Sequence, residues 1–149
     1  MLCPEDAVFH KAKLALLPLM FLASVAHADK TGIEECIKAK IADSYKTDKQ
    51  LRTQSSTVLD YGGARHYQTT LLKGQTYHVL TCADKNVRDL DIILYDSKGK
   101  IVVRDTLDNR EPTLKFIPAA TGTYFVTLYV RSMVDHTKKS DVAFSLMFE

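Results

Sequence analysis

The sequence has no tryptophan, only three cysteines, and no apolar run long enough to cross a bilayer. A membrane-spanning helix needs about 20 apolar residues, and the most apolar stretch, Leu14 to Val25, is shorter and contains Pro18. Net charge is also small, with 20 basic against 18 acidic residues. Nucleic-acid-binding proteins carry a basic patch, whereas no cluster of Lys and Arg here exceeds a pair. We therefore expect a protein that neither spans a membrane nor binds nucleic acid.

Motifs of common enzymes are also missing. The sequence contains no Gly-x-Ser-x-Gly nucleophile elbow, no His-Glu-x-x-His metal-binding motif and no glycine-rich phosphate loop. Scattered Ser, His and Asp residues occur in any chain of 149 residues, so they do not indicate an active site. No pair of carboxylates suited to glycoside hydrolysis can be located from spacing. We expect no enzyme activity and no required cofactor.

The start of the chain has the pattern of a secretory signal. Lys11 and Lys13 precede the apolar run, which ends in Ala26-His27-Ala28. A positive segment, a short apolar segment and small residues at −3 and −1 are typical of signal-peptidase substrates, so cleavage is predicted after Ala28. A buried helix is the alternative interpretation. The expected organisation is a signal peptide at 1–28, a helix and linker at 29–57, and a β-sandwich at 58–149. The mature protein is expected in the periplasm or secreted.

The cysteines agree with export. Cys3 precedes the apolar run and would be removed with the signal, which leaves Cys36 and Cys82. Two cysteines in an oxidising compartment predict one disulfide. Two buried free thiols or two metal ligands are the alternatives, although two cysteines alone are a weak metal signal.

The mature sequence changes its periodicity once. Ile33, Ile37 and Ile41 recur at helical spacing and predict a helix from about Gly32 to Lys46. Residues 47–57 are polar and are interpreted as a linker. The following segments alternate apolar and polar residues between turns and are expected as strands: 66–72, 76–82, 89–95, 100–105, 113–117, 123–131 and 142–148. The predicted fold is mainly β, a jelly-roll-like antiparallel sandwich of seven or eight strands with one N-terminal helix.

Three motifs follow one another in the sandwich region. They are the turn Leu72-Lys73-Gly74-Gln75-Thr76-Tyr77, the run Asp89-Leu90-Asp91-Ile92-Ile93-Leu94-Tyr95-Asp96, and the stretch Pro118-Ala119-Ala120-Thr121-Gly122-Thr123-Tyr124. In this order they resemble the bacterial pre-peptidase C-terminal domain, a sandwich appended to many secreted proteins. The resemblance implies a non-catalytic module, with carbohydrate, matrix or calcium binding in some members. Our first expectation for function is therefore an exported binding module of this type.

The C-terminal third carries a second resemblance. A glycine-tyrosine strand, Gly122 to Val130, is followed by a basic loop and a final amphipathic strand. This arrangement is similar to small periplasmic lysozyme inhibitors, which implies an inhibitor or immunity protein as the alternative function. Such inhibitors present hydroxyl or cationic side chains to an acidic catalytic cleft. The candidate binding residues are Thr121, Tyr124, Arg131, His136, Lys138 and Lys139. The expected partner is an envelope or extracellular protein or a glycan, and the oligomeric state is not predicted.

Four aspartates crowd one segment of the chain. Asp84, Asp89, Asp91 and Asp96 offer the oxygen ligands that calcium prefers, and Asp89 and Asp91 share one face of the predicted strand. Asp89, Asp91 and Asp96 are accordingly the candidate calcium ligands. The other interpretation is that these residues flank strand ends and turns, where aspartate is favoured.

Overall fold

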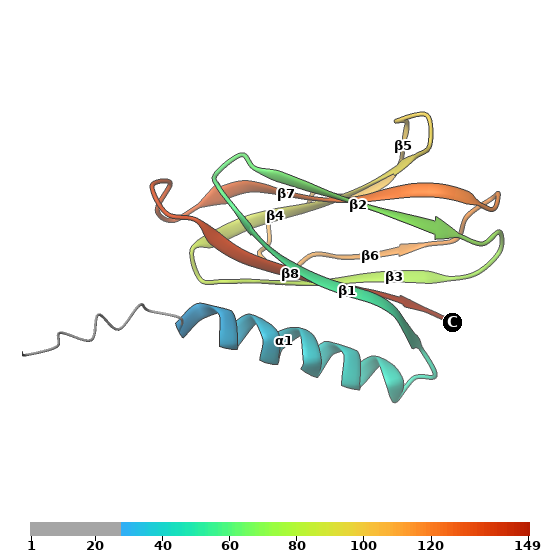
Figure 1. The fold of residues 1–149 in the computed structure, drawn as a ribbon, viewed down its shortest axis with the longest axis horizontal. Coiled ribbons are helices and arrows are strands. Elements are labelled where there is room, and N and C mark those ends of the chain that lie inside the picture. Colours follow the sequence, from blue (N-terminus) through green and yellow to red (C-terminus); the bar gives the residue numbers. More distant parts are fainter. Residues whose placement is uncertain (1–27) are drawn as a thin grey trace, which may run out of the picture.

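The computed structural model describes residues 28–149, with the surroundings of side chains from residue 32 onward. Apart from Ala28, the predicted signal peptide, Cys3 included, lies outside the described residues. The described chain forms one helix followed by eight strands (Figure 1). These elements are α1 (Ala28–Tyr45), β1 (Gln50–Leu59), β2 (Ala64–Leu71), β3 (Tyr77–Ala83), β4 (Val87–Asp96), β5 (Ile101–Asp105), β6 (Thr113–Phe116), β7 (Gly122–Met133) and β8 (Ser140–Phe148).

The strands form two four-stranded sheets that face each other. One sheet has the order β1-β8-β3-β6 and the other β2-β7-β4-β5, and neighbouring strands are antiparallel. Strands that are consecutive in the sequence, such as β1 and β2 or β7 and β8, lie in opposite sheets. The chain therefore wraps around the core as in a jelly roll, and the predicted mainly β sandwich is confirmed.

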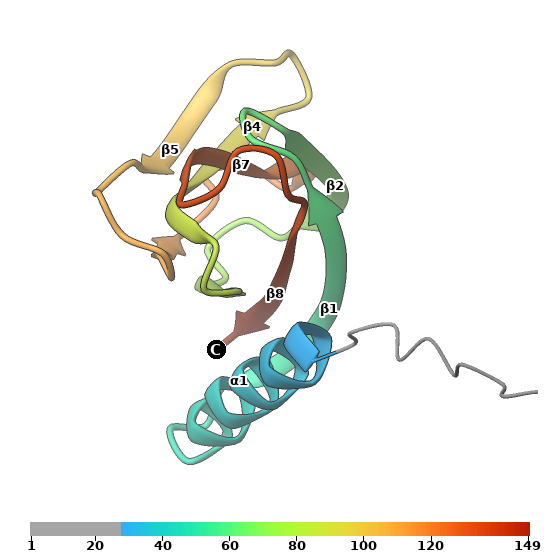
Figure 2. The ribbon, with the colours of Figure 1, turned by 90° about the vertical axis from the view of Figure 1, so that its left-hand side faces the viewer.

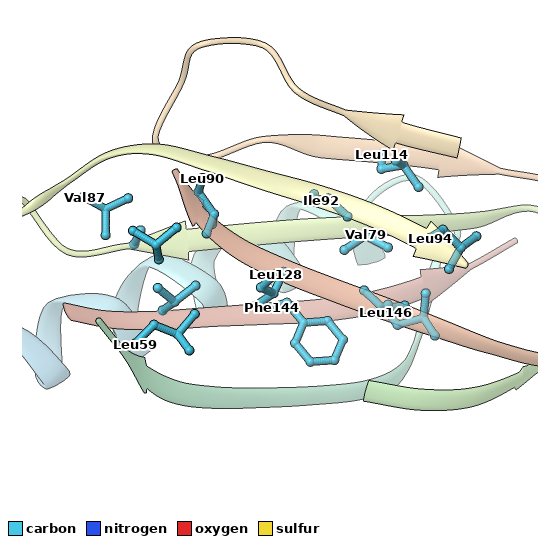
Figure 3. Close-up of a cluster of buried hydrophobic side chains, with 14 of the residues drawn as sticks. Leu59, Val79, Val87, Leu90, Ile92, Leu94, Leu114, Leu128, Phe144 and Leu146 are labelled. Carbon is cyan, nitrogen blue, oxygen red and sulfur yellow. The ribbon is translucent and has the colours of Figure 1, made fainter. Parts of the chain in front are cut away.

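The core lies between the two sheets, where alternate residues of each strand point inward (Figure 3). Leu90, Ile92 and Leu94 of β4 are each at most 1% exposed, as the predicted alternation requires. Phe144 and Leu146 of β8 face them from the other sheet. Burying a side chain of this size stabilises the fold by about 1.5–3 kcal/mol.

Helix α1 covers the outer face of the sheet that contains β1 and β8 (Figure 2). Its Ile33, Ile37 and Ile41 are buried against Ala143 and Met147, which point outward from β8. The disulfide between Cys36 of α1 and Cys82 of β3 joins the helix to the sheet, so the predicted pairing is confirmed. The helix begins four residues earlier than expected and ends one residue earlier.

The interpretation of residues 47–57 as a linker was wrong. Gln50–Leu59 form β1, which pairs with β8 along its length. The inward-facing positions Thr53, Ser55 and Thr57 lie opposite Leu146, Phe144 and Val142 of β8. These hydroxyl-bearing side chains occupy positions that are apolar in an ordinary core strand, so no hydrophobic alternation marked β1. Backbone pairing at the sheet edge holds this strand.

Candidate functional site

The six candidate binding residues lie at opposite ends of the sandwich. Thr121 and Tyr124 stand at the start of β7, whereas Arg131 is near its end and the remaining three follow in the β7–β8 loop. Strand β7 is 12 residues long, so its ends lie roughly 40 Å apart at about 3.3 Å per residue. One contact patch therefore cannot contain all six. We call the two regions the Thr121 end (loops 72–76, 97–100 and 117–121) and the Tyr61 end (loops 60–63, 84–86 and 134–139).

At the Thr121 end, two loops are fastened to each other by hydrogen bonds. The Lys73 backbone N–H donates to Thr121 Oγ1 at 2.9 Å. The Gly74 N–H donates to the Pro118 carbonyl at 3.0 Å, and Gly74 has a φ of 75°, in the left-handed region that favours glycine. The β2–β3 and β6–β7 loops thus form one preorganised tip.

Tyr124 supports this tip from within. This residue is 7% exposed, and its hydroxyl donates to the Ala120 carbonyl at 2.9 Å. The Tyr124 hydroxyl is therefore already engaged inside the protein. Thr121, by contrast, is exposed, and its hydroxyl hydrogen is free to donate while its oxygen accepts from Lys73. Of the two predicted hydroxyl residues, only Thr121 presents its side chain to solvent.

The surface of the Thr121 end combines apolar and cationic side chains. Leu72 is 48% and Ile117 is 54% exposed, and the two lie on the joined loops. The exposed cations at this end are Lys73, Lys98 and Lys100. Sequence reasoning did not select Leu72, Ile117 or these lysines. The available signal was the presence of a large apolar residue two positions before the turn residue Gly74 and of another directly before Pro118.

Two acidic side chains at this end are engaged by the protein itself. Asp96 Oδ1 accepts from the backbone N–H groups of Lys98 and Lys100, each at 2.9 Å. The Glu149 carboxylate lies 3.0 Å from His78 Nε2 and 3.5 Å from Lys49 Nζ, and the hydrogen bond with His78 lowers the pKa of Glu149. The tip itself therefore presents amines and methyl groups more than carboxylates.

At the Tyr61 end, the β7–β8 loop is fixed by Asn86. The Asn86 amide nitrogen donates to the Asp135 carbonyl at 3.1 Å and to Ser140 Oγ at 3.0 Å. Its amide oxygen accepts from the Asp135 N–H at 2.8 Å. Asp84, one of the clustered aspartates, accepts from the Asn86 and Asp141 N–H groups at 2.9 and 2.7 Å. Asp84 therefore stabilises the conformation of these loops through hydrogen bonds to the backbone.

The predicted cations of the β7–β8 loop have partners. Lys138 lies 3.2 Å from Asp135, and Lys139 lies 3.7 Å from Asp60. Hydrogen bonds from Thr137 and Lys138 lower the pKa of Asp135 to about 2. The two lysines of this loop therefore lie in ion pairs with Asp135 and Asp60.

The other two candidates at this end are Arg131 of β7 and His136 of the β7–β8 loop. Arg131 Nε is 3.8 Å from the Asp89 carboxylate. The ring of the exposed His136 stacks on Tyr61, with centroids 4.1 Å apart and an angle of 11° between the planes. Both side chains are thus oriented by the protein's own neighbours.

The three predicted calcium ligands do not converge. Asp89 and Asp91 share the outer face of β4 and are 5% and 4% exposed. Asp96 lies seven residues further along the strand than Asp89, or roughly 23 Å at about 3.3 Å per residue. Among the described residues, the one set of three potential metal ligands close together is Cys36, Cys82 and Glu111, and its sulfur atoms are joined in the disulfide.

Asp89 and Asp91 nevertheless form an unusual pair. The Oδ1 atom of each is buried and has no hydrogen-bond partner among the described residues. Burial raises the pKa of Asp91, and the charge of Asp89 raises it further. This part of β4 therefore places carboxylates where an apolar or neutral side chain would cost less free energy.

The chain matches no protein-family profile and no curated protein sequence. Solved structures do match it. The periplasmic g-type lysozyme inhibitor PliG from Aeromonas hydrophila aligns with a TM-score of 0.50 at 14% identity, covering 65% of this chain and 85% of that chain. The pre-peptidase C-terminal domain of a Bacillus anthracis collagenase aligns with a TM-score of 0.50 at 13% identity, covering 64% and 89%.

Both families that the sequence motifs resemble are therefore found among proteins of similar structure. At these identities the likeness establishes a shared fold. Among the described residues, no helix has both the length and the hydropathy needed to cross a bilayer.

Proposed function

We propose that this protein is an exported, non-catalytic binding module that inhibits a cell-wall-degrading muramidase through its Thr121 end. The observation that carries the proposal is the preorganised tip, in which two hydrogen-bonded loops present Leu72, Ile117 and Thr121 among lysines. The fold shared with PliG, a periplasmic inhibitor of g-type lysozyme, supports the choice of partner. The fold shared with a pre-peptidase C-terminal domain supports a non-catalytic module.

The chemistry of the tip suits a glycosidase cleft. Most glycoside hydrolases place two carboxyl groups around the scissile bond, so their clefts are acidic. Lys73, Lys98 and Lys100 complement that charge, and complementary charge speeds encounter and orients docking. Leu72 and Ile117 supply the apolar centre that protein interfaces usually contain within a polar rim. Thr121 supplies a hydroxyl donor for a cleft carboxylate.

The rigidity of the tip favours tight binding. A loop that orders only on binding loses conformational entropy in the complex, whereas a preformed loop avoids much of that cost. Here the bonds from Lys73 and Gly74 to the β6–β7 loop hold the conformation before any partner arrives. The disulfide supports export, because such bonds persist in oxidising compartments.

A lysis assay tests the proposal. The protein is purified from a periplasmic fraction and added to suspensions of bacterial cell walls with a g-type, c-type or i-type lysozyme. We expect the clearing rate to fall in proportion to the inhibitor added for at least one type, with g-type the first choice. If saturating protein leaves all three enzymes unaffected, the inhibitor function is wrong. The remaining candidate is then the binding module of pre-peptidase C-terminal type.

A further inference from the structure

A cleft of about 230 Å³ opens along one long side of the sandwich, between β1 and β2. These strands are the neighbouring edges of the two sheets. Thr53 and Ser55 of β1 point inward opposite core residues of β8, and Thr69 of β2 points inward opposite Tyr124. Because these side chains are small, they do not fill the space between the sheets as the leucines elsewhere in the core do.

The floor of the cleft is aromatic and apolar. Tyr67 and Phe144 form a tilted ring pair with centroids 4.4 Å apart, and Val126 and Leu146 lie beside them. Such a floor packs well against the flat, C–H-bearing face of a ring. It gives the cleft an apolar surface beneath a polar opening, as small-molecule sites usually have.

The rim is polar, and its hydrogen-bonding capacity is unused. It contains the hydroxyl groups of Thr53, Ser55 and Thr69, which make no hydrogen bond with another described residue. His66 and Gln68 alternate with Tyr67 and Thr69 along β2, so their side chains point to the outer face of the sheet, where His66 Nδ1 lies 2.7 Å from Thr127 Oγ1. Hydroxyl groups both donate and accept, so they match a ligand that itself carries several hydroxyl groups.

The charge and the volume of the cleft restrict the chemical class of the ligand further. No Asp, Glu, Lys or Arg lines the cleft, and an ion entering it would lose hydration without gaining a counter-charge. The volume corresponds to about eight waters at about 30 Å³ each, which is space for one six-membered ring with its substituents. We infer that this cleft binds a single neutral sugar ring, a pyranose that stacks on Tyr67 and hydrogen-bonds to the hydroxyl rim.

This site is separate from the proposed inhibitory surface. Its residues lie along the β1–β2 side, and none belongs to the loops of the Thr121 end. The sugar-binding inference and the proposed muramidase inhibition can therefore be tested independently, and failure of one would not contradict the other. A ligand of one ring in a half-open cleft is expected to bind with a dissociation constant in the millimolar range.

An NMR titration of the full mature protein tests the inference. The probes are methyl glycosides of glucose and of N-acetylglucosamine, with cyclohexanol as an apolar ring of the same size. We expect saturable shifts of the backbone amides of β1 and β2 around Ser55 and Thr69 with at least one glycoside. Absence of saturable shifts, shifts spread over the whole surface, or equally tight binding of cyclohexanol would each overturn the inference.

Two variants test whether the sugar binds in the cleft between β1 and β2. Thr53→Val keeps the side-chain shape but removes a rim hydroxyl, and we expect it to weaken sugar binding at least threefold without changing muramidase inhibition. Thr57→Val is the matched control, because Thr57 also points inward from β1 but does not line the cleft. Equal affinities for both variants and the wild-type protein would contradict the assigned site. The amide spectra of the variants report whether each has folded.

Discussion

Removing the disulfide should destabilise the protein by an amount that the structure allows us to calculate. Cys36 and Cys82 are separated by 46 residues, and the loop between them contains β1 and β2. The chain-entropy model gives a loss of about 4 kcal/mol for opening a loop of this length. This is a large share of a total stability on the order of 5–15 kcal/mol, so the Cys36→Ser, Cys82→Ser double variant should fold but with a small margin.

Other contacts should keep the helix docked in that variant. Ile33, Ile37 and Ile41 remain buried against β8, and Lys40 Nζ donates to the Thr81 carbonyl at 2.6 Å while lying 2.8 Å from Glu111. We therefore expect one cooperative unfolding transition at lower denaturant, rather than separate release of the helix.

Urea denaturation followed by circular dichroism measures this loss, since the chain has no tryptophan for fluorescence. With a slope of about 2 kcal/mol per molar urea, a loss of about 4 kcal/mol lowers the midpoint by about 2 M. Wild-type protein in reducing agent should give the same curve as the double variant. A midpoint shift below about 0.5 M in both would refute the reasoning, because it corresponds to only about 1 kcal/mol.

Two further changes test local features. Because folding raises the pKa of Asp91 above 3.8, the wild-type protein loses stability as the pH rises through that raised pKa. Asp91→Asn should therefore add about 1–3 kcal/mol at pH 7, measured by urea unfolding at several pH values, and a gain that persists below pH 3.8 would contradict this. Asn86→Ala removes three side-chain hydrogen bonds to oxygen or nitrogen and one to the Met133 sulfur, and it should cost about 2–3 kcal/mol. Amide exchange at Asp135 should accelerate in this variant, and unchanged exchange would show that Asn86 does not hold the loop.

The sequence predicted those elements whose inward side chains are apolar. Leu90, Ile92 and Leu94 mark β4, and Ile33 and Ile37 mark the helix, because burial imposes a period of two or of 3.6 on apolar residues. Strand β1 lacks this signal, since Thr53 and Ser55 occupy its inward positions. Thr53 and Ser55, whose hydroxyl groups made the strand hard to predict, also line the cleft between β1 and β2.

The site was harder to predict than the fold. Side-chain alternation indicates which face of a strand is buried, but it does not say which loops meet at its ends. That depends on the strand order, which places most consecutive strands, β4 and β5 excepted, in opposite sheets. The order brings Lys73 to Thr121 across 48 residues, and it places Lys138 at the other end of the molecule. The sequence also does not reveal that the Tyr124 hydroxyl donates a hydrogen bond to the Ala120 carbonyl.

The central claim, that the Thr121 end contacts a muramidase, is tested most directly by two matched variants in the lysis assay. Ile117 is 54% and Val134 is 58% exposed, and they lie at opposite ends of the sandwich. Ile117→Asp puts a charge into the proposed apolar centre and should raise the inhibition constant at least about 30-fold, the equivalent of about 2 kcal/mol. Val134→Asp should inhibit as the wild-type protein does. Loss of inhibition in Val134→Asp with full inhibition by Ile117→Asp would place the contact at the Tyr61 end and contradict the account.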